Sequence, residues 1–117
     1  KKKIKIFNKI GLKLIVCSSS LNEARKVMKL KPYAIAFEDP KLIGTGKSIT
    51  KYKAKDVKKF TEMLKGSKII PLCGAGISSK KDVIEAKRLG CKGVLISSAI
   101  VKARDDKFLE ELSKVRI

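Results

Sequence analysis

The sequence predicts an α/β fold in which four βα units, preceded by the end of a helix, form a parallel sheet. Short apolar runs of strand length alternate along the chain with amphipathic segments of helical period. Glycine or proline stands near the ends of these segments, at Gly11, Pro32, Gly66 and Gly90. Strands that alternate with helices pair in parallel through right-handed crossovers. With 117 residues, 44% of them hydrophobic, the chain is long enough for one core.

The predicted strands are apolar runs of the length that a buried parallel strand needs. They cover residues 12–17, 33–37, 68–73 and 93–97. Pro71 is unexpected inside the third run, because proline removes one donor from a strand ladder. Nothing in the sequence explains this proline.

The predicted helices follow helical spacing of apolar residues and local start signals. They cover residues 2–10, 20–29, 56–65, 79–89 and the segment from about 105 onward. Ser20 with Glu23, and Ser79 with Asp82, have the spacing of N-terminal capping pairs. Val57, Phe60 and Leu64 are predicted to share one face of their helix, and Phe108, Leu109 and Leu112 are predicted to be buried; the helix over 79–89 contains Val83, Ile84, Ala86, Lys87 and Leu89. From the end of the second strand to about residue 53, we expect a loop.

Two architectures accommodate this order of elements. One is half of a (β/α)₈ barrel, and the other is an open flavodoxin-like sheet. A complete barrel needs about 250 residues, so this chain is short for one. The chain begins with Lys1 and not with methionine, and we expect it to be part of a longer protein. Residues 1–117 are therefore predicted to form a single partial domain.

The charge balance is strongly basic, with 29 Lys and Arg against 11 Asp and Glu, a net charge of +18. The lysines recur on the polar sides of the helical patterns, and aromatic residues make up only 5%. A specific nucleic-acid interface would concentrate basic residues on one face and interleave them with aromatics. We therefore expect a solvated lysine-rich surface and no specific nucleic-acid partner.

Residue types also exclude several classes of site. Cys17, Cys73 and Cys91 lack C-x-x-C spacing and the chain has no His, so neither a metal site nor a His-activated nucleophile is expected. Reduced, buried cysteines in a cytoplasmic protein are the expectation. No apolar run approaches the roughly 18 residues of a membrane span, and the basic N-terminus lacks the apolar part of a secretion signal.

Glu38 is the first candidate functional residue. It closes the apolar run of the second strand and stands immediately before a glycine-punctuated loop, residues 39–47. Barrel enzymes place catalytic groups where parallel strands emerge from the core. Taken alone, a Glu at this position is better explained as a residue that simply ends a strand.

Three segments at predicted strand ends are suited to holding a phosphate group. They are Ile43-Gly44-Thr45-Gly46, Gly74-Ala75-Gly76 and Ile96-Ser97-Ser98-Ala99. Glycine and small residues permit close backbone approach, and exposed N–H groups before a helix bind anions. A nucleotide-binding P-loop is excluded because it needs glycine where Lys41 stands, and no G-x-G-x-x-G fingerprint is present.

The succession of these motifs resembles triosephosphate isomerase. The order is E-D-P-K-L-I-G-T-G-K, then C-G-A-G-I-S, then G-V-L-I-S-S, and the D-P-K-L-I-G-T-G wording is most similar to the archaeal branch. The resemblance covers the chain from Gly11 onward and favours the barrel: an α/β fold that is the C-terminal half of a (β/α)₈ TIM barrel. It implies an aldose–ketose isomerase of glycolysis and gluconeogenesis that interconverts dihydroxyacetone phosphate and glyceraldehyde 3-phosphate without cofactor or metal.

By the same resemblance, Glu38 is the general base that moves a proton through an enediolate. The closing lid corresponds to Asp39, Pro40, Lys41, Leu42, Thr45, Gly46 and Lys47, and the phosphate-binding positions to Ile43, Gly44, Gly76, Ser97 and Ser98. Two residues depart from the family pattern: Asp39 replaces the usual proline, and Ala99 stands where archaeal members tend to have glycine.

The family's Asn-x-Lys segment and electrophilic His belong to its first half and have no counterpart here. We therefore expect this chain to need the N-terminal half of the barrel, on the same or a separate chain, and to be inactive or nearly so alone. The resemblance also implies a homo-oligomer, dimer or tetramer, of the complete protein. Two alternatives stay open: half of another phosphate-binding barrel enzyme, and a non-catalytic basic nucleic-acid-binding remnant.

Overall fold

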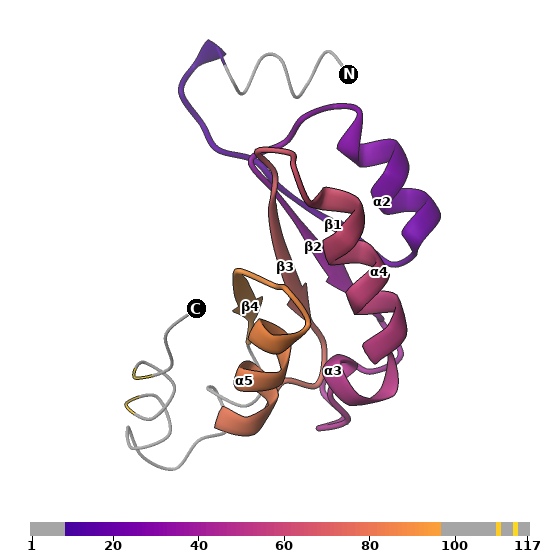
Figure 1. Ribbon diagram of the computed structural model, residues 1–117. Helices are drawn as coiled ribbons and strands as arrows, with labels where there is room; N and C mark the ends of the chain where they lie inside the picture. The colour runs from indigo at the N-terminus through magenta and orange to yellow at the C-terminus, as the bar shows by residue number, and fades with distance from the viewer. Residues whose placement is uncertain (1–8, 97–109, 111–113, 115–117) are drawn as a thin grey trace.

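The computed structural model describes residues 9–96, 110 and 114, and residues 9–96 form one sheet with helices (Figure 1). The strands are β1 (Ile15–Ser18), β2 (Ala34–Glu38), β3 (Ile70–Gly74) and β4 (Gly93–Leu95). The helices are α2 (Leu21–Met28), α3 (Ile49–Tyr52), α4 (Ala54–Leu64) and α5 (Lys80–Arg88). All strand pairs are parallel, and the strand order is β1-β2-β3-β4.

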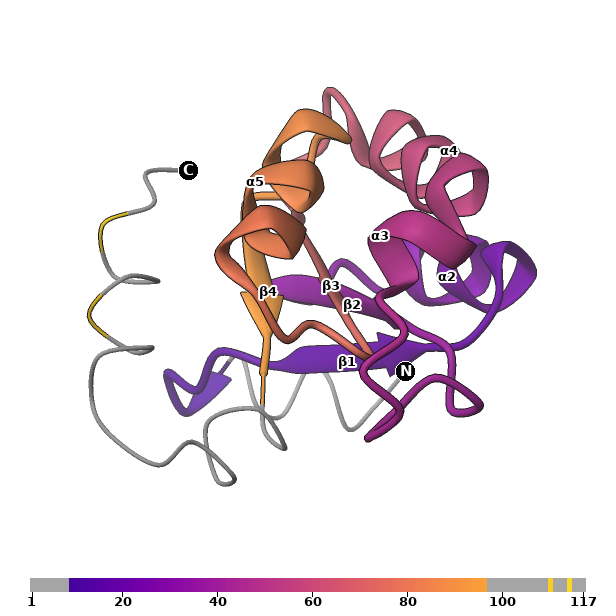
Figure 2. The same cartoon turned by 90° about the horizontal axis from the view of Figure 1, so that it is seen from below.

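The strand order decides between the two predicted architectures. Each strand pairs with the next one in the chain, so every crossover runs in the same direction across the sheet. Right-handed crossovers then place all helices on one face, and Figure 2 shows α2, α3, α4 and α5 on the same side of the strands. A flavodoxin-like sheet reverses its strand order and carries helices on both faces. The fold is therefore half of a (β/α)₈ barrel.

The helix starts follow the predicted capping pairs. The Ser20 hydroxyl accepts a hydrogen bond from the N–H of Glu23 at 3.1 Å, and the Ser79 hydroxyl accepts one from Asp82 at 3.2 Å. In return, each carboxylate accepts a hydrogen bond from the backbone N–H of the residue before the capping serine. Glu23 accepts from Ser19 at 2.9 Å, and Asp82 accepts from Ser78 at 3.0 Å. Short-range chemistry thus fixes where α2 and α5 begin.

The core lies between the sheet and the helices. Phe60 of α4 is fully buried and stacks on Phe37 of β2, with ring centroids 5.2 Å apart. Val57 and Leu64 share this buried face of α4, as predicted. Burying one such side chain stabilises a fold by about 1.5–3 kcal/mol. The lysines that the structure describes are all exposed, which confirms the predicted lysine-rich surface.

Several element boundaries differ from the prediction. The first strand begins at Ile15 and not at residue 12, and the helix predicted from Asp56 begins at Ala54. The predicted loop before it contains the short helix α3, because the Ser48 hydroxyl caps it and Ile49 is completely buried. Most of the helix predicted from about residue 105, and most of that over 2–10, lies outside the described residues.

Pro71 sits inside β3 but at the start of its ladder with β4. Its carbonyl accepts from the N–H of Lys92 at 2.8 Å, while β3–β4 pairing begins one residue later, at Leu72 and Gly93. An N–H at this position would point toward β4, where strand pairing has not yet begun. The sheet therefore loses no ladder hydrogen bond at Pro71.

The face of the sheet opposite the helices corresponds to the barrel interior. Residues in register share a face, so Glu38, Gly74 and Leu95 form one row at the carboxyl end of the strands. Lower rows contain Cys17, Ala36, Leu72 and Gly93, and then Ile15, Ala34 and Ile70. Cys73 and Cys91 are buried as expected, but Cys17 is exposed because it lies on this inner face.

Candidate active site

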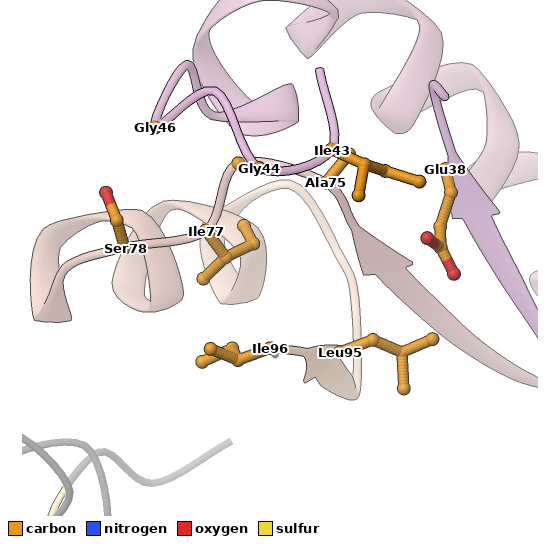
Figure 3. A pocket seen from close by; sticks show the side chains of 10 residues that line it. Glu38, Ile43, Gly44, Gly46, Ala75, Ile77, Ser78, Leu95 and Ile96 are labelled. Carbon is orange, nitrogen blue, oxygen red and sulfur yellow. The ribbon is translucent and has the colours of Figure 1, made fainter. Parts of the chain in front are cut away.

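A hollow of about 360 Å³ opens at the carboxyl edge of the sheet and contains the predicted base. It is lined by Glu38, Ile43, Gly44, Gly46, Ala75, Gly76, Ile77, Ser78, Leu95 and Ile96. Figure 3 shows Ile43 extending from the loop toward Glu38, with Leu95 on the β4 side of the hollow. The structure therefore brings Glu38, the loop after it and the turn after β3 to one place.

Glu38 ends strand β2 and is held from the neighbouring strand β1. The thiol of Cys17 donates a hydrogen bond to Oε1 of Glu38 at 3.3 Å. Partial desolvation of this largely exposed thiol first, and then the hydrogen bond to Glu38 and its negative charge, raise the pKa of Cys17. Cys17 thus stays a neutral donor near neutral pH, which is the form that this contact requires.

The loop over residues 39–47 is ordered by its own hydrogen bonds. The Asp39 carboxylate accepts from the N–H of Lys41 at 3.0 Å, and its carbonyl accepts from the N–H of Leu42 at 2.9 Å. The Thr45 hydroxyl donates to the Leu42 carbonyl at 2.6 Å and accepts from the N–H of Lys47 at 3.0 Å. The segment is therefore a sequence of tight turns and not an extended linker.

Asp39 also connects the start of this loop to the helices behind it. Its Oδ2 atom lies 3.9 Å from Nζ of Lys53, the residue between α3 and α4. A second ion pair, Glu85–Arg88, lies within helix α5. Asp39 thus accepts a hydrogen bond within a turn and also pairs with the cation of Lys53.

The turn after β3 approaches the loop closely. Ala75 has a φ of 88° and Gly76 a φ of 68°, both in the left-handed region. A Cβ atom on Gly76 would lie 1.9 Å from the Lys47 carbonyl oxygen, so only glycine fits here. The N–H of Ile49 donates to the Ala75 carbonyl at 3.0 Å. The end of the loop is therefore fixed against this turn.

Backbone donors at these two segments suit an anion. Among the described residues, the N–H groups of Gly44 and Gly76 have no hydrogen-bond acceptor. The start of α5 lies beside them, since Ser78 lines the same hollow. A helix N-terminus adds a favourable field for negative charge. The N–H of Ser78 is already used, because it donates to Asp82 at 3.0 Å.

The predicted site residues fall into three groups. Glu38, Ile43, Gly44, Gly46 and Gly76 line the hollow together. The remaining lid residues lie in the same loop but outside that lining set: Asp39, Pro40, Lys41, Leu42, Thr45 and Lys47. Ser97 and Ser98, like Ala99, lie outside the described residues.

Ala75 and Ile96, which belong to two of the segments predicted to hold a phosphate, also line the hollow. Ile77, Ser78 and Leu95 line it too and were not predicted to do so. Ser78 could have been found from its place between the glycine turn and the Ser79 cap, and Leu95 from its place at a strand end. No group of three or more His, Cys, Asp or Glu side chains suited to a metal ion occurs among the described residues. No helix in the described part of the chain is long and apolar enough to cross a membrane.

The fold and the hollow together define a class: a β/α-barrel segment with one carboxylate and anion-suited turns at the carboxyl ends of its strands. The family described as "Triosephosphate isomerase" matches residues 1–115. Triosephosphate isomerase of Pyrobaculum calidifontis is 42% identical over 98 residues, and that of Methanocaldococcus jannaschii is 41% identical over 110. The chain belongs to the triosephosphate isomerase family.

The matches cover most of this chain but less than half of each relative. The P. calidifontis match covers 82% of this chain and 43% of the relative, and the M. jannaschii match covers 90% and 49%. The chain therefore spans about half the length of the curated relatives that it matches.

Several solved structures are also similar to the chain in fold. The Amycolatopsis orientalis BexX/CysO complex contains a chain that matches with a TM-score of 0.72 and 20% identity, covering 96% of this chain and 43% of that one. FabK from Thermotoga maritima matches with a TM-score of 0.69 and 21% identity, over 88% and 32%. At these identities, the likeness concerns the fold alone.

Proposed function

We propose that the complete protein carrying this chain is a triosephosphate isomerase that interconverts dihydroxyacetone phosphate and glyceraldehyde 3-phosphate. The observation that carries the proposal is the hollow in which Glu38 faces the loop over 39–47 and the turn at Gly76. A carboxylate base beside free backbone donors is what proton transfer on a small phosphorylated carbonyl compound needs. Membership of the family supports this substrate over other phosphorylated metabolites.

Glu38 is assigned the role of general base. Its carboxylate takes a proton from one substrate carbon and returns it to the adjacent carbon, so that an enediolate forms between the two steps. The Cys17 thiol, 3.3 Å away, keeps the carboxylate at the strand end and donates to it while it is charged. General-base catalysis of this kind contributes about 10²–10⁴-fold to a rate.

The phosphate group is assigned to the backbone around the hollow. Gly44 and Gly76 supply N–H groups that have no acceptor among the described residues. Ile43, Ser97 and Ser98 complete the phosphate-binding set, and residues 39–47 form the lid that excludes water. A water-free site strengthens the interactions of both the base and the donors, because charges interact more strongly at low dielectric.

The remaining catalytic groups must come from outside this chain. It contains no histidine, so the electrophile that stabilises the enediolate is supplied elsewhere in the complete protein. Loss of a single stabilising donor typically costs about 2.7–4 kcal/mol of transition-state free energy. We therefore propose that residues 1–117 alone are a partial domain with little or no activity. The complete protein is proposed to be a cytoplasmic homo-oligomer, dimer or tetramer.

The two alternatives have less support. Half of another phosphate-binding barrel enzyme would share the turn at Gly76 and explain the hollow, but the chain matches the isomerase family over nearly its full length. A nucleic-acid-binding remnant would rest on the net charge of +18 alone. It would show binding to DNA or RNA that weakens steeply with salt and is unaffected by Glu38→Gln.

Glu38→Gln in the complete protein tests the proposal. Turnover in a coupled triose phosphate assay is expected to fall by about 10²–10⁴-fold, because the amide cannot accept the proton. The urea midpoint should change little, since the side chain keeps its size. Glu62→Gln, which replaces an exposed carboxylate of α4, is the matched control. Near-normal turnover of Glu38→Gln would overturn the assignment of the base.

A further inference from the structure

Gly74 lies beside Glu38 in the sheet, and its backbone conformation does not require glycine. The two residues are register partners of β3 and β2 and share the inner face of the sheet. Gly74 is buried, and it is absent from the residues with positive φ. Its backbone conformation is therefore open to any residue. The demand for glycine must come from its surroundings.

The surroundings of Gly74 are the side chain of Glu38 and the next strand. A Cβ atom on Gly74 would lie 3.2 Å from Cγ and 3.3 Å from Cδ of Glu38. It would also lie 3.2 Å from Cβ of Leu95, which is attached directly to the backbone of β4. Because Leu95 Cβ cannot move without its strand, the Glu38 side chain is the group that would yield. Its carboxyl carbon would then shift by a few tenths of an ångström.

We propose that Gly74 is a positioning residue for Glu38. The bare backbone of Gly74 lets the Glu38 side chain lie against β3 while Cys17 holds its carboxylate from β1. The position of the base is thus set from both neighbouring strands, by a hydrogen bond on one side and by the lack of a side chain on the other. This inference rests on the proposed role of Glu38 as the base.

Gly93 provides a matched control in the next strand. It too is absent from the residues with positive φ, and it lies on the same face of the sheet as Gly74. A Cβ atom on Gly93 would meet Cδ2 of Leu72 at 2.9 Å, which is the far end of a flexible side chain. No contact with Glu38 would arise within 4 Å. Gly93→Ala therefore introduces the same methyl group on the same face of the sheet, one row lower, without touching the base.

The test compares Gly74→Ala and Gly93→Ala in the complete protein. Gly74→Ala should lower kcat by about tenfold or more and change KM less than twofold, because the base moves while the phosphate donors stay. Misplacement by about 1 Å can cost about 10²-fold, so a smaller shift should cost less. Gly93→Ala should keep kcat within about twofold of the starting protein. Equal kcat values for the two variants would overturn the proposal.

A spectroscopic measurement tests the position of Glu38 without relying on activity. It applies if Gly74→Ala folds poorly or if the starting protein is not an isomerase. The carboxyl carbon-13 resonance of Glu38, assigned with Glu38→Gln, should move in the folded fraction of Gly74→Ala and stay in place in Gly93→Ala. An unmoved resonance in Gly74→Ala would overturn the proposal whatever the kinetics. If the starting protein lacked isomerase activity, the proposed function would fail, while this resonance would still decide whether Gly74 positions Glu38.

Discussion

The Cys17 thiol lies 3.3 Å from Oε1 of Glu38 and donates a hydrogen bond to it across the β1–β2 pair. Cys17 pairs in register with Ala36, two residues before Glu38, so the thiol reaches along the inner face to the strand end. The only side-chain hydrogen bond of Glu38 among the described residues is therefore made by a cysteine that the sequence alone indicated to be a buried structural residue.

Removing the Glu38 charge should make Cys17 more reactive. Burial, the hydrogen bond to Glu38 and its charge raise the pKa of Cys17, so the thiolate that reacts with iodoacetamide forms only at higher pH. Glu38→Gln removes the charge and should lower the pKa partway toward its ordinary value. Alkylation of Cys17 near pH 8, followed by peptide mass spectrometry, should then be faster than in the starting protein. An unchanged rate would contradict the electrostatic coupling.

The same pKa shift affects stability in alkaline solution. A group whose folded-state pKa is raised contributes stability below its unfolded pKa, and this contribution is lost as the pH rises through the folded pKa. Cys17→Ala should therefore weaken the decline of the urea midpoint above the ordinary thiol pKa of about 8.5. A decline equally steep in both proteins would exclude Cys17 as a source.

Phe60 should be among the side chains that stabilise the fold most. It is fully buried and stacks on Phe37 at 5.2 Å. Phe60→Ala leaves a cavity between α4 and the sheet and should lower the free energy of unfolding by about 3–5 kcal/mol. Tyr52→Ala is the control, because Tyr52 is 55% exposed, and it should cost less than about 1 kcal/mol. Similar urea midpoints for the two variants would contradict this core.

The start of the loop over 39–47 should depend more on the Asp39 turn than on its ion pair. Asp39 accepts from the N–H of Lys41 at 3.0 Å, whereas the exposed Lys53 cation lies 3.9 Å away. Exposed ion pairs contribute about 0–1 kcal/mol and are screened by salt. Asp39→Asn keeps an acceptor for the turn, so Asp39→Asn and Lys53→Met should bind a phosphorylated inhibitor nearly as well as the starting protein.

Asp39→Ala removes both interactions and should weaken inhibitor binding measurably more than Lys53→Met does. Calorimetric titration of the complete protein at low and high salt distinguishes the two contributions. If Lys53→Met were as damaging as Asp39→Ala at both salt concentrations, the ion pair would be the main constraint on the loop.

Local chemistry made much of the fold predictable. The capping pairs at Ser20 and Ser79 act over three residues, so the starts of α2 and α5 follow from the sequence. Helix α3 was missed because its formation depends on tertiary contacts, with Ile49 buried and bonded through its N–H to Ala75. The local pattern fits both a half barrel and an open sheet; the family resemblance favoured the barrel, and the strand order confirms it.

The candidate site was predictable where one residue type implies one role. Glu38 and Gly76 could be assigned from strand-end position and from motif order, and both line the hollow. The contribution of Gly74 could not, because it depends on the register that places Gly74 opposite Glu38. The hydrogen bond from Cys17 likewise depends on which side of the sheet each residue of β1 faces. The sequence of this four-residue strand does not determine that side.

The most direct test of the proposed role of Glu38 is triose phosphate isomerisation by the complete protein in deuterium oxide. A carboxylate that carries a proton between two carbons exchanges it with solvent while the enediolate exists. We therefore expect isomerisation with deuterium at the newly protonated carbon of the product, measured by NMR or mass spectrometry. No isomerisation at all, or deuterated product formed as fast by Glu38→Gln as by the starting protein, would contradict the role of Glu38 as a proton-transferring base.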